Sequence, residues 1–334
     1  MSGRAASGQR RVLSGQPPYH LTNHLTSPCT NRPFPLMSSS RLEGTDLDTL
    51  LDDGIRYDRS GVGARARACF LEITERAHER PDLAAEAWWR LANVQRLQSQ
   101  WDDAIASARA GAELARTHGL RDTEADALNV EAAVWATRGD VRRAWSLFER
   151  MLELATRPLT RANALQNLGG LAAEERRFDE AERLFGASRD AYREADDLRG
   201  EACSLLNIGR LQAERGDPAL AKGTLEAAVH HSRTAGDMEM HAAALLNLGI
   251  ALGTLGEHGN AEERITTAYG QFTIADNAVQ RVRCLLQLAE LASGRGEPDA
   301  ARVCLAHARQ IAAETDLPRE LRLIDEHLAR LGDA

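Results

Sequence analysis

The chain has 334 residues, a net charge of −8 and an aromatic content of only 4%. This acidic balance argues against a nucleic-acid-binding surface, and no apolar run reaches the ~18 residues of a membrane span. The five cysteines form no CxxC pair, which argues against zinc-ribbon and dithiol motifs and favours small buried residues in a reducing compartment. They are Cys29, Cys69, Cys203, Cys284 and Cys304.

Residues 1–44 form a basic segment with no helical or strand period. Residues 1–41 hold five arginines and no acidic residue, a composition typical of a disordered tail. The segment lacks the apolar core of a secretory signal and the amphipathic pattern of a transit peptide. An alternative is that translation starts at Met37, which precedes an ordinary polar opening. We therefore expect a tail over 1–44 and one folded domain over 45–334.

Helical patterns begin near Asp46 and come in pairs separated by short polar breaks. Apolar and small residues recur at i, i+3, i+4 and i+7 within each segment, which predicts seven helical hairpins, the first of them degenerate. An alanine recurs in the second segment of the other six, at spacings of 40, 37, 40, 40 and 40: Ala104, Ala144, Ala181, Ala221, Ala261 and Ala301. The last segment, Pro318–Leu331, has one apolar stripe and is expected to cap the stack.

Glycines stand at two kinds of position in the hairpins. In four breaks a glycine falls where the first helix must end, as a left-handed C′ residue: Gly139, Gly216, Gly256 and Gly296. Ser99 and Arg176 take that place in two others, at an expected cost of ~1 kcal/mol each. Mid-helix glycines are expected to let the two helices of a hairpin approach closely, opposite the repeated alanine: Gly169, Gly209 and Gly249.

The most regular stretch is Ala164–Phe185, ALQNLGGLAAEERRFDEAERLF. Its Leu168-Gly169 pair, Phe178-Asp-Glu-Ala181 turn and Phe185 resemble the tetratricopeptide repeat, and the resemblance extends over residues 45–315. The period is near 40 rather than about 34, and we expect the extra residues between hairpins, near 195–200, 235–239 and 275–279. This variant resembles the repeats of kinesin light chains, LGN-type adaptors and bacterial MalT-like and SARP-type regulators.

The resemblance implies an all-α fold, a right-handed α-solenoid of about seven hairpins with a C-terminal capping helix. In such a solenoid the first helix of each hairpin lines the concave face. The register then predicts a partner-binding groove, with Arg90, Asn129 and Ile250 on the same face. Its residues are Trp89, Asn93, Asn163, Gln166, Asn167, Glu174, Asn207, Arg210, Glu214, Asn247, Arg283, Gln287 and Glu290.

Three kinds of groove residue leave alternatives open. The amide series Asn167, Asn207 and Asn247, continued by Gln287, either binds a partner's backbone or bonds to neighbouring backbone and water. The arginines Arg210 and Arg283 either meet acidic groups of a partner or form salt bridges with Glu174 or Glu214. Trp89 either anchors a partner or packs against the first hairpin.

Catalytic patterns are lacking. His230 and His231 are adjacent, so they do not form an i, i+4 metal pair, and no phosphate loop or GxSxG motif occurs. We expect no enzyme activity, cofactor or metal, and no direct contact with nucleic acid or membrane. The predicted function is a cytoplasmic protein-interaction scaffold, in a bacterium because Lys222 is the only lysine against forty arginines. The alternative is a stand-alone regulatory sensor that switches on a small peptide or metabolite.

Overall fold

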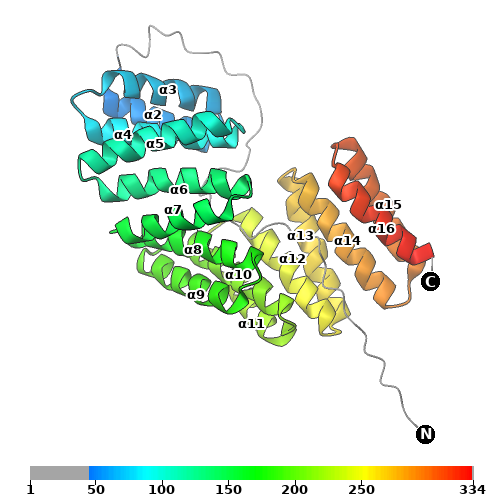
Figure 1. Cartoon of the computed structure of the whole chain (residues 1–334). Helices are drawn as coiled ribbons and strands as arrows, with labels where there is room; N and C mark the ends of the chain where they lie inside the picture. Colours follow the sequence, from blue (N-terminus) through cyan, green and yellow to red (C-terminus); the bar gives the residue numbers. More distant parts are fainter. Residues whose placement is uncertain (1–44, 333–334) are drawn as a thin grey trace. The chain divides into compact units, whose positions relative to one another are not determined.

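The computed structural model describes residues 45–332, and every regular element in that range is an α-helix. The seven predicted hairpins and the capping helix are all present, and these helices are followed in chain order in Figure 1. The expectations for residues 1–44, including the Met37 start and Cys29, lie outside the described residues. The helices are α2 (Leu47–Arg59), α3 (Gly63–Arg76), α4 (Pro81–Leu97), α5 (Trp101–Thr117), α6 (Arg121–Thr137), α7 (Val141–Leu154), α8 (Pro158–Glu174), α9 (Phe178–Glu194), α10 (Leu198–Glu214), α11 (Pro218–Thr234), α12 (Met238–Thr254), α13 (His258–Ile274), α14 (Ala278–Gly294), α15 (Pro298–Glu314) and α16 (Pro318–Gly332).

Two compact units make up the described chain, residues 45–207 and 208–332, with their boundary inside α10. Within each unit, helices that follow one another pack together. First helices of neighbouring hairpins also pack together, as α4 does on α6 and α12 on α14. Because a first helix has neighbours on more sides, it buries more of its length: α8 buries eleven residues and α9 six.

The turns between helices share one conformation. Three residues usually join two helices, and the middle one is left-handed, with φ of 81° at Gly139. Ser99 and Arg176 adopt the same conformation, with φ of 58° and 60°, so the predicted turn geometry is confirmed. A backbone bond of 2.9 Å from Asp140 N–H to Trp135 C=O closes the turn, as expected of a helix C-terminus.

The 40-residue period arises from helix length. Helices of 17 residues alternate with three-residue turns, and only residues 195–197, 235–237 and 275–277 separate the later hairpins. The prediction that the extra residues lie between hairpins is therefore wrong. The physical reason is N-capping: Asp237 accepts from Met240 N–H, and Asn277 accepts from Gln280 N–H, so the next helix begins at once.

The mid-helix glycines receive a bulky side chain of the partner helix. A Cβ on Gly249 would lie 2.5 Å from Ile265 Cγ1 and 3.1 Å from the Ala261 carbonyl oxygen. Equivalent contacts of 2.5 to 2.7 Å pair Gly209 with Leu225 and Gly169 with Phe185. The predicted close approach is confirmed, but the main contact is the residue one turn after the repeated alanine.

The capping helix and the cysteines also follow their predicted roles. Ile324 of α16 is fully buried against α14 and α15, and Leu321, Leu328 and Leu331 pack on the same cluster. Four free cysteines lie in the described part, buried at Cys69, Cys203 and Cys284 and half-buried at Cys304. Burial raises the pKa of Cys284 to about 12, as expected for an inert structural thiol.

Candidate functional site

Two predicted groove amides of α8 lie inside the helix stack of residues 45–207. Gln166 is fully buried, and its Oε1 accepts from the Ser188 hydroxyl at 3.1 Å and the Ser204 hydroxyl at 2.8 Å. Asn167 is 1% exposed and donates to Asn129 Oδ1 at 2.8 Å. Because these bonds join α8 to α9, α10 and α6, both side chains hold neighbouring repeats together.

Two further asparagines of this unit are also engaged within it. Asn163 accepts from the Tyr192 hydroxyl at 2.6 Å, which joins α8 to α9. Asn93 is 4% exposed and accepts from the Arg96 guanidinium at 2.8 Å. A partner would have to displace these bonds to reach either amide.

The remaining candidates of this unit differ in exposure. Trp89 is half-buried and packs on a cluster formed by α4, α5 and α6, not on the first hairpin, with the Arg90 guanidinium 4.5 Å from its ring centroid. Glu174 is exposed at the end of α8, although partial desolvation raises its pKa. Asn207 is fully buried, and neither its Nδ2 nor its Oδ1 has a hydrogen-bond partner in the described part of the chain.

In residues 208–332 two arginines of the first helices lie near each other. Arg210 is 4% exposed in α10, and Arg283 in α14 donates to Gln280 Oε1 at 2.8 Å. Burial lowers the pKa of Arg283 to about 10, and the charge of Arg210 adds to this shift. Among residues 45–332 Arg283 forms no ion pair, so a salt bridge with the half-buried Glu214 is not present.

Asn247 takes the second of its two predicted roles. It is 7% exposed, and its Nδ2 donates to the Ala243 carbonyl oxygen of its own helix at 2.8 Å. The amide series therefore does not form one continuous row of unoccupied donors and acceptors.

A cavity of about 310 Å³ lies between α12, α13 and α14 and brings three first-helix residues together. These are Ile250, Gln287 and Glu290, of which the last two were predicted groove residues. Ile265 and Leu291 supply apolar walls, and each covers a glycine of α12, since a Cβ would lie 2.5 Å from Ile265 at Gly249 and 2.7 Å from Leu291 at Gly253. At Gly294, which also lines the cavity, the space that a Cβ would take is open.

Two polar groups of residues that line this cavity lack hydrogen-bond partners. His258 Nδ1 is buried and has no hydrogen-bond partner in the part of the chain that is described. The amide of half-buried Gln287 likewise forms no hydrogen bond within residues 45–332. A buried polar group without a partner costs ~1–3 kcal/mol, and a ligand recovers that energy only if the His258 ring turns to bring Nδ1 to the cavity. The sequence reasoning missed His258 because it opens a second helix, and only first helices were expected to line the groove.

Neither metal nor membrane chemistry finds support in the described residues. No group of three or more His, Cys, Asp or Glu side chains there is placed to hold a metal ion. None of the described helices has the length and apolar character needed to cross a membrane.

Comparison with known proteins identifies the repeat. The sequence model of the tetratricopeptide repeat family matches residues 160–230, which cover most of α8, all of α9 and α10, and most of α11. Residues 160–230 are tetratricopeptide repeats. No curated protein matches its sequence.

Solved structures with similar coordinates are themselves repeat solenoids, which confirms the all-α solenoid fold. BtubC (BKLC) from P. vanneervenii is 18% identical, with 64% of this chain and 91% of that chain covered and a TM-score of 0.57. A Rap protein complexed with Competence and Sporulation Factor is 16% identical, with coverage of 83% and 79% and a TM-score of 0.62. The signal transduction ATPase PH0952 from Pyrococcus horikoshii, which has a tetratricopeptide repeat sensor, is 12% identical, with coverage of 88% and 47% and a TM-score of 0.68. At these identities the likeness shows the fold alone.

Proposed function

We propose that this tetratricopeptide repeat protein is an interaction scaffold that binds a segment of a partner protein at the cavity between α12, α13 and α14. One observation carries the proposal. Ile250, Gln287 and Glu290 of the first helices surround a single cavity, and His258 Nδ1 and the Gln287 amide in its wall lack hydrogen-bond partners within the described residues.

The cavity suits a short extended segment with one apolar side chain. Its volume of about 310 Å³ is at the lower end of small binding sites, enough for one anchoring residue between Ile250, Ile265 and Leu291. The Gln287 amide offers both donors and acceptors to the backbone of the segment, without reading its sequence. Open space beside the backbone of Gly294 lets the segment approach closely.

Charge and fold relationship give further support. Arg283 lies one helical turn before Gln287 on α14 and forms no ion pair within residues 45–332, so an acidic residue beside the anchor would be favoured. A Rap protein of similar fold was solved in a complex with Competence and Sporulation Factor. We propose the bacterial cytoplasm as the setting, and a non-catalytic role.

The test is a matched pair of substitutions at apolar positions. Peptides selected from a display library against the full chain are titrated against the wild type, Ile250→Arg and Val303→Arg. Ile250 lines the cavity, whereas Val303 on α15 is 70% exposed and is not among its lining residues. We expect at least a tenfold loss of affinity for Ile250→Arg and none for Val303→Arg, with unchanged circular dichroism. Equal affinities for both variants contradict the proposed site.

A second candidate function is a stand-alone regulatory sensor. It is favoured by the similar Pyrococcus horikoshii protein, whose tetratricopeptide repeat region is a sensor. A sensor changes conformation when it binds, whereas a static scaffold does not. Small-angle scattering with and without a selected peptide separates the two, because only the sensor changes its radius of gyration.

A further inference from the structure

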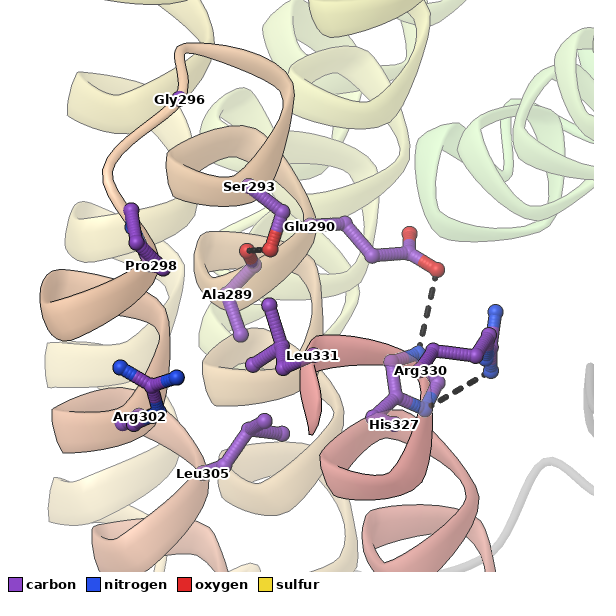
Figure 2. A pocket seen from close by; sticks show the side chains of 10 residues that line it. All are labelled: Ala289, Glu290, Ser293, Gly296, Pro298, Arg302, Leu305, His327, Arg330 and Leu331. Carbon is purple, nitrogen blue, oxygen red and sulfur yellow. Dashed lines mark hydrogen bonds and ion pairs between the residues drawn. The ribbon is translucent and has the colours of Figure 1, made fainter. Parts of the chain in front are cut away.

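A second cavity, of about 490 Å³, lies between α14, α15 and the capping helix α16. Figure 2 shows Leu305 and Leu331 near its middle, with Glu290, His327 and Arg330 grouped on one side. It therefore combines an apolar wall with a cluster of charged groups, on residues that are mostly distinct from those of the proposed partner site.

His327 lies between two hydrogen-bond acceptors in this arrangement. Its Nδ1 lies 2.9 Å from the Leu323 carbonyl oxygen, and its Nε2 lies 3.2 Å from Glu290 Oε1. The contact with Glu290 raises the pKa of His327, and the imidazolium can donate to both neighbours at once.

The cation of Arg330 lies beside this ring. Its guanidinium is 3.2 Å from His327 Nδ1 and can donate there only when Nδ1 carries no proton. When both ring nitrogens are protonated, the contact brings two positive groups together. Arg330 donates through Nε to the Glu326 carbonyl oxygen at 3.2 Å, and within residues 45–332 it forms no ion pair.

The charges around the cavity do not balance. Arg302, on the α15 side, is paired with Asp299 at 2.8 Å. Glu290 pairs with His327, which leaves the charge of Arg330 without a carboxylate in the described chain. An anion at this point would neutralise the charge of Arg330.

We propose that the cavity beneath α16 binds a small amphipathic carboxylate. The carboxylate accepts hydrogen bonds from Arg330 beside His327, and the apolar body packs against Ala289, Leu305 and Leu331. The volume of about 490 Å³ lies well within the range of small-molecule sites. Such a ligand contacts the last hairpin and the capping helix together, so it stabilises the C-terminal end of the stack. This site shares only Glu290 with the lining of the partner cavity, and it does not depend on partner binding there.

The test titrates the full chain with decanoate, below its critical micelle concentration, and with decan-1-ol, its uncharged analogue of the same chain length. Arg330→Gln removes the unbalanced charge, and Arg322→Gln, an exposed arginine of the same helix, is its control. We expect decanoate to bind at least tenfold more tightly than decanol, and Arg330→Gln to weaken decanoate about tenfold while Arg322→Gln does not.

A second readout keeps the proposal testable if Arg330→Gln disturbs the helix. Bound carboxylate adds a negative charge near His327, so the pKa of its ring, followed by NMR, rises with decanoate and stays constant with decanol. A tripeptide, acetyl-Ala-Leu-Leu with a free carboxyl terminus, tests whether a peptide end is preferred to a fatty acid. Equal binding of decanoate and decanol, no binding of either carboxylate, or an unmoved His327 pKa overturns the proposal.

Discussion

The same glycine-to-alanine substitution should have opposite effects on the two helices of one hairpin. Gly249 lies in the middle of α12 and faces its partner helix, where a Cβ would lie 2.5 Å from Ile265 Cγ1 and 3.1 Å from the Ala261 carbonyl oxygen. Gly270 lies in α13 and has no atom within 4 Å of such a Cβ.

The magnitudes follow from two opposing contributions. Alanine is favoured over glycine in a helix by ~1 kcal/mol, so Gly270→Ala should raise the free energy of unfolding by about that amount. At Gly249 the same gain is opposed by overpacking, which costs ~1–3 kcal/mol. Neither atom moves away easily, because Cγ1 is bonded directly to Cβ of Ile265 and the other atom is the backbone carbonyl oxygen of Ala261. We expect Gly249→Ala to lose ~1 kcal/mol, which places the two variants ~2 kcal/mol apart.

Urea unfolding, followed by circular dichroism, measures the stability of both variants. The urea midpoints are compared directly, because repeat arrays need not unfold in two states. Ile265→Ala alone should cost ~2–5 kcal/mol, and in that background Gly249→Ala should cost less than it does in the wild type, since the side chain that resists the methyl is gone. If Gly249→Ala is as stable as Gly270→Ala, close helix approach is not the reason for glycine at this position.

Three further predictions follow from individual contacts. Arg176→Gly should stabilise the chain by ~1 kcal/mol in thermal or urea unfolding, because its φ of 60° strains a residue with a Cβ. The His327–Glu290 contact, which raises the pKa of His327, stabilises the fold fully below the unfolded pKa of about 6.5, and this contribution is lost as pH rises through the folded pKa. Stability should therefore fall from pH 6 to pH 9 in the wild type, and less so in Glu290→Gln. A double-mutant cycle with Asn167→Ala and Asn129→Ala should show a coupling of about 0.5–1.5 kcal/mol, since their side chains share one hydrogen bond of 2.8 Å.

Local pattern was sufficient to predict the repeat itself. The helical spacing, the turn glycines and the apolar stripe of Pro318–Leu331 predicted seven hairpins and a cap, because each rests on neighbours within about one turn in sequence. Even the left-handed Arg176 was predicted, from its register with Gly216. The helix starts after residues 195–197 and 235–237 were missed, since loop and capping residues share the same polar composition.

The site was predicted less well, because it depends on side chains from other repeats. Gln166 has the spacing of a groove residue, yet Ser188 and Ser204 meet it and keep it buried. Nothing in the register of α8 alone shows those hydroxyls. Gln287 and His258 come together only because α12, α13 and α14 leave a cavity, and cavities follow from three-dimensional packing.

The most direct test of the central claim is hydrogen–deuterium exchange of the full chain with and without a library-selected peptide. Partner binding at the α12–α14 cavity predicts slower exchange in α12, α14 and the start of α13 around His258. Slower exchange confined to α11 and α15, or to residues 45–207, would contradict the proposed site.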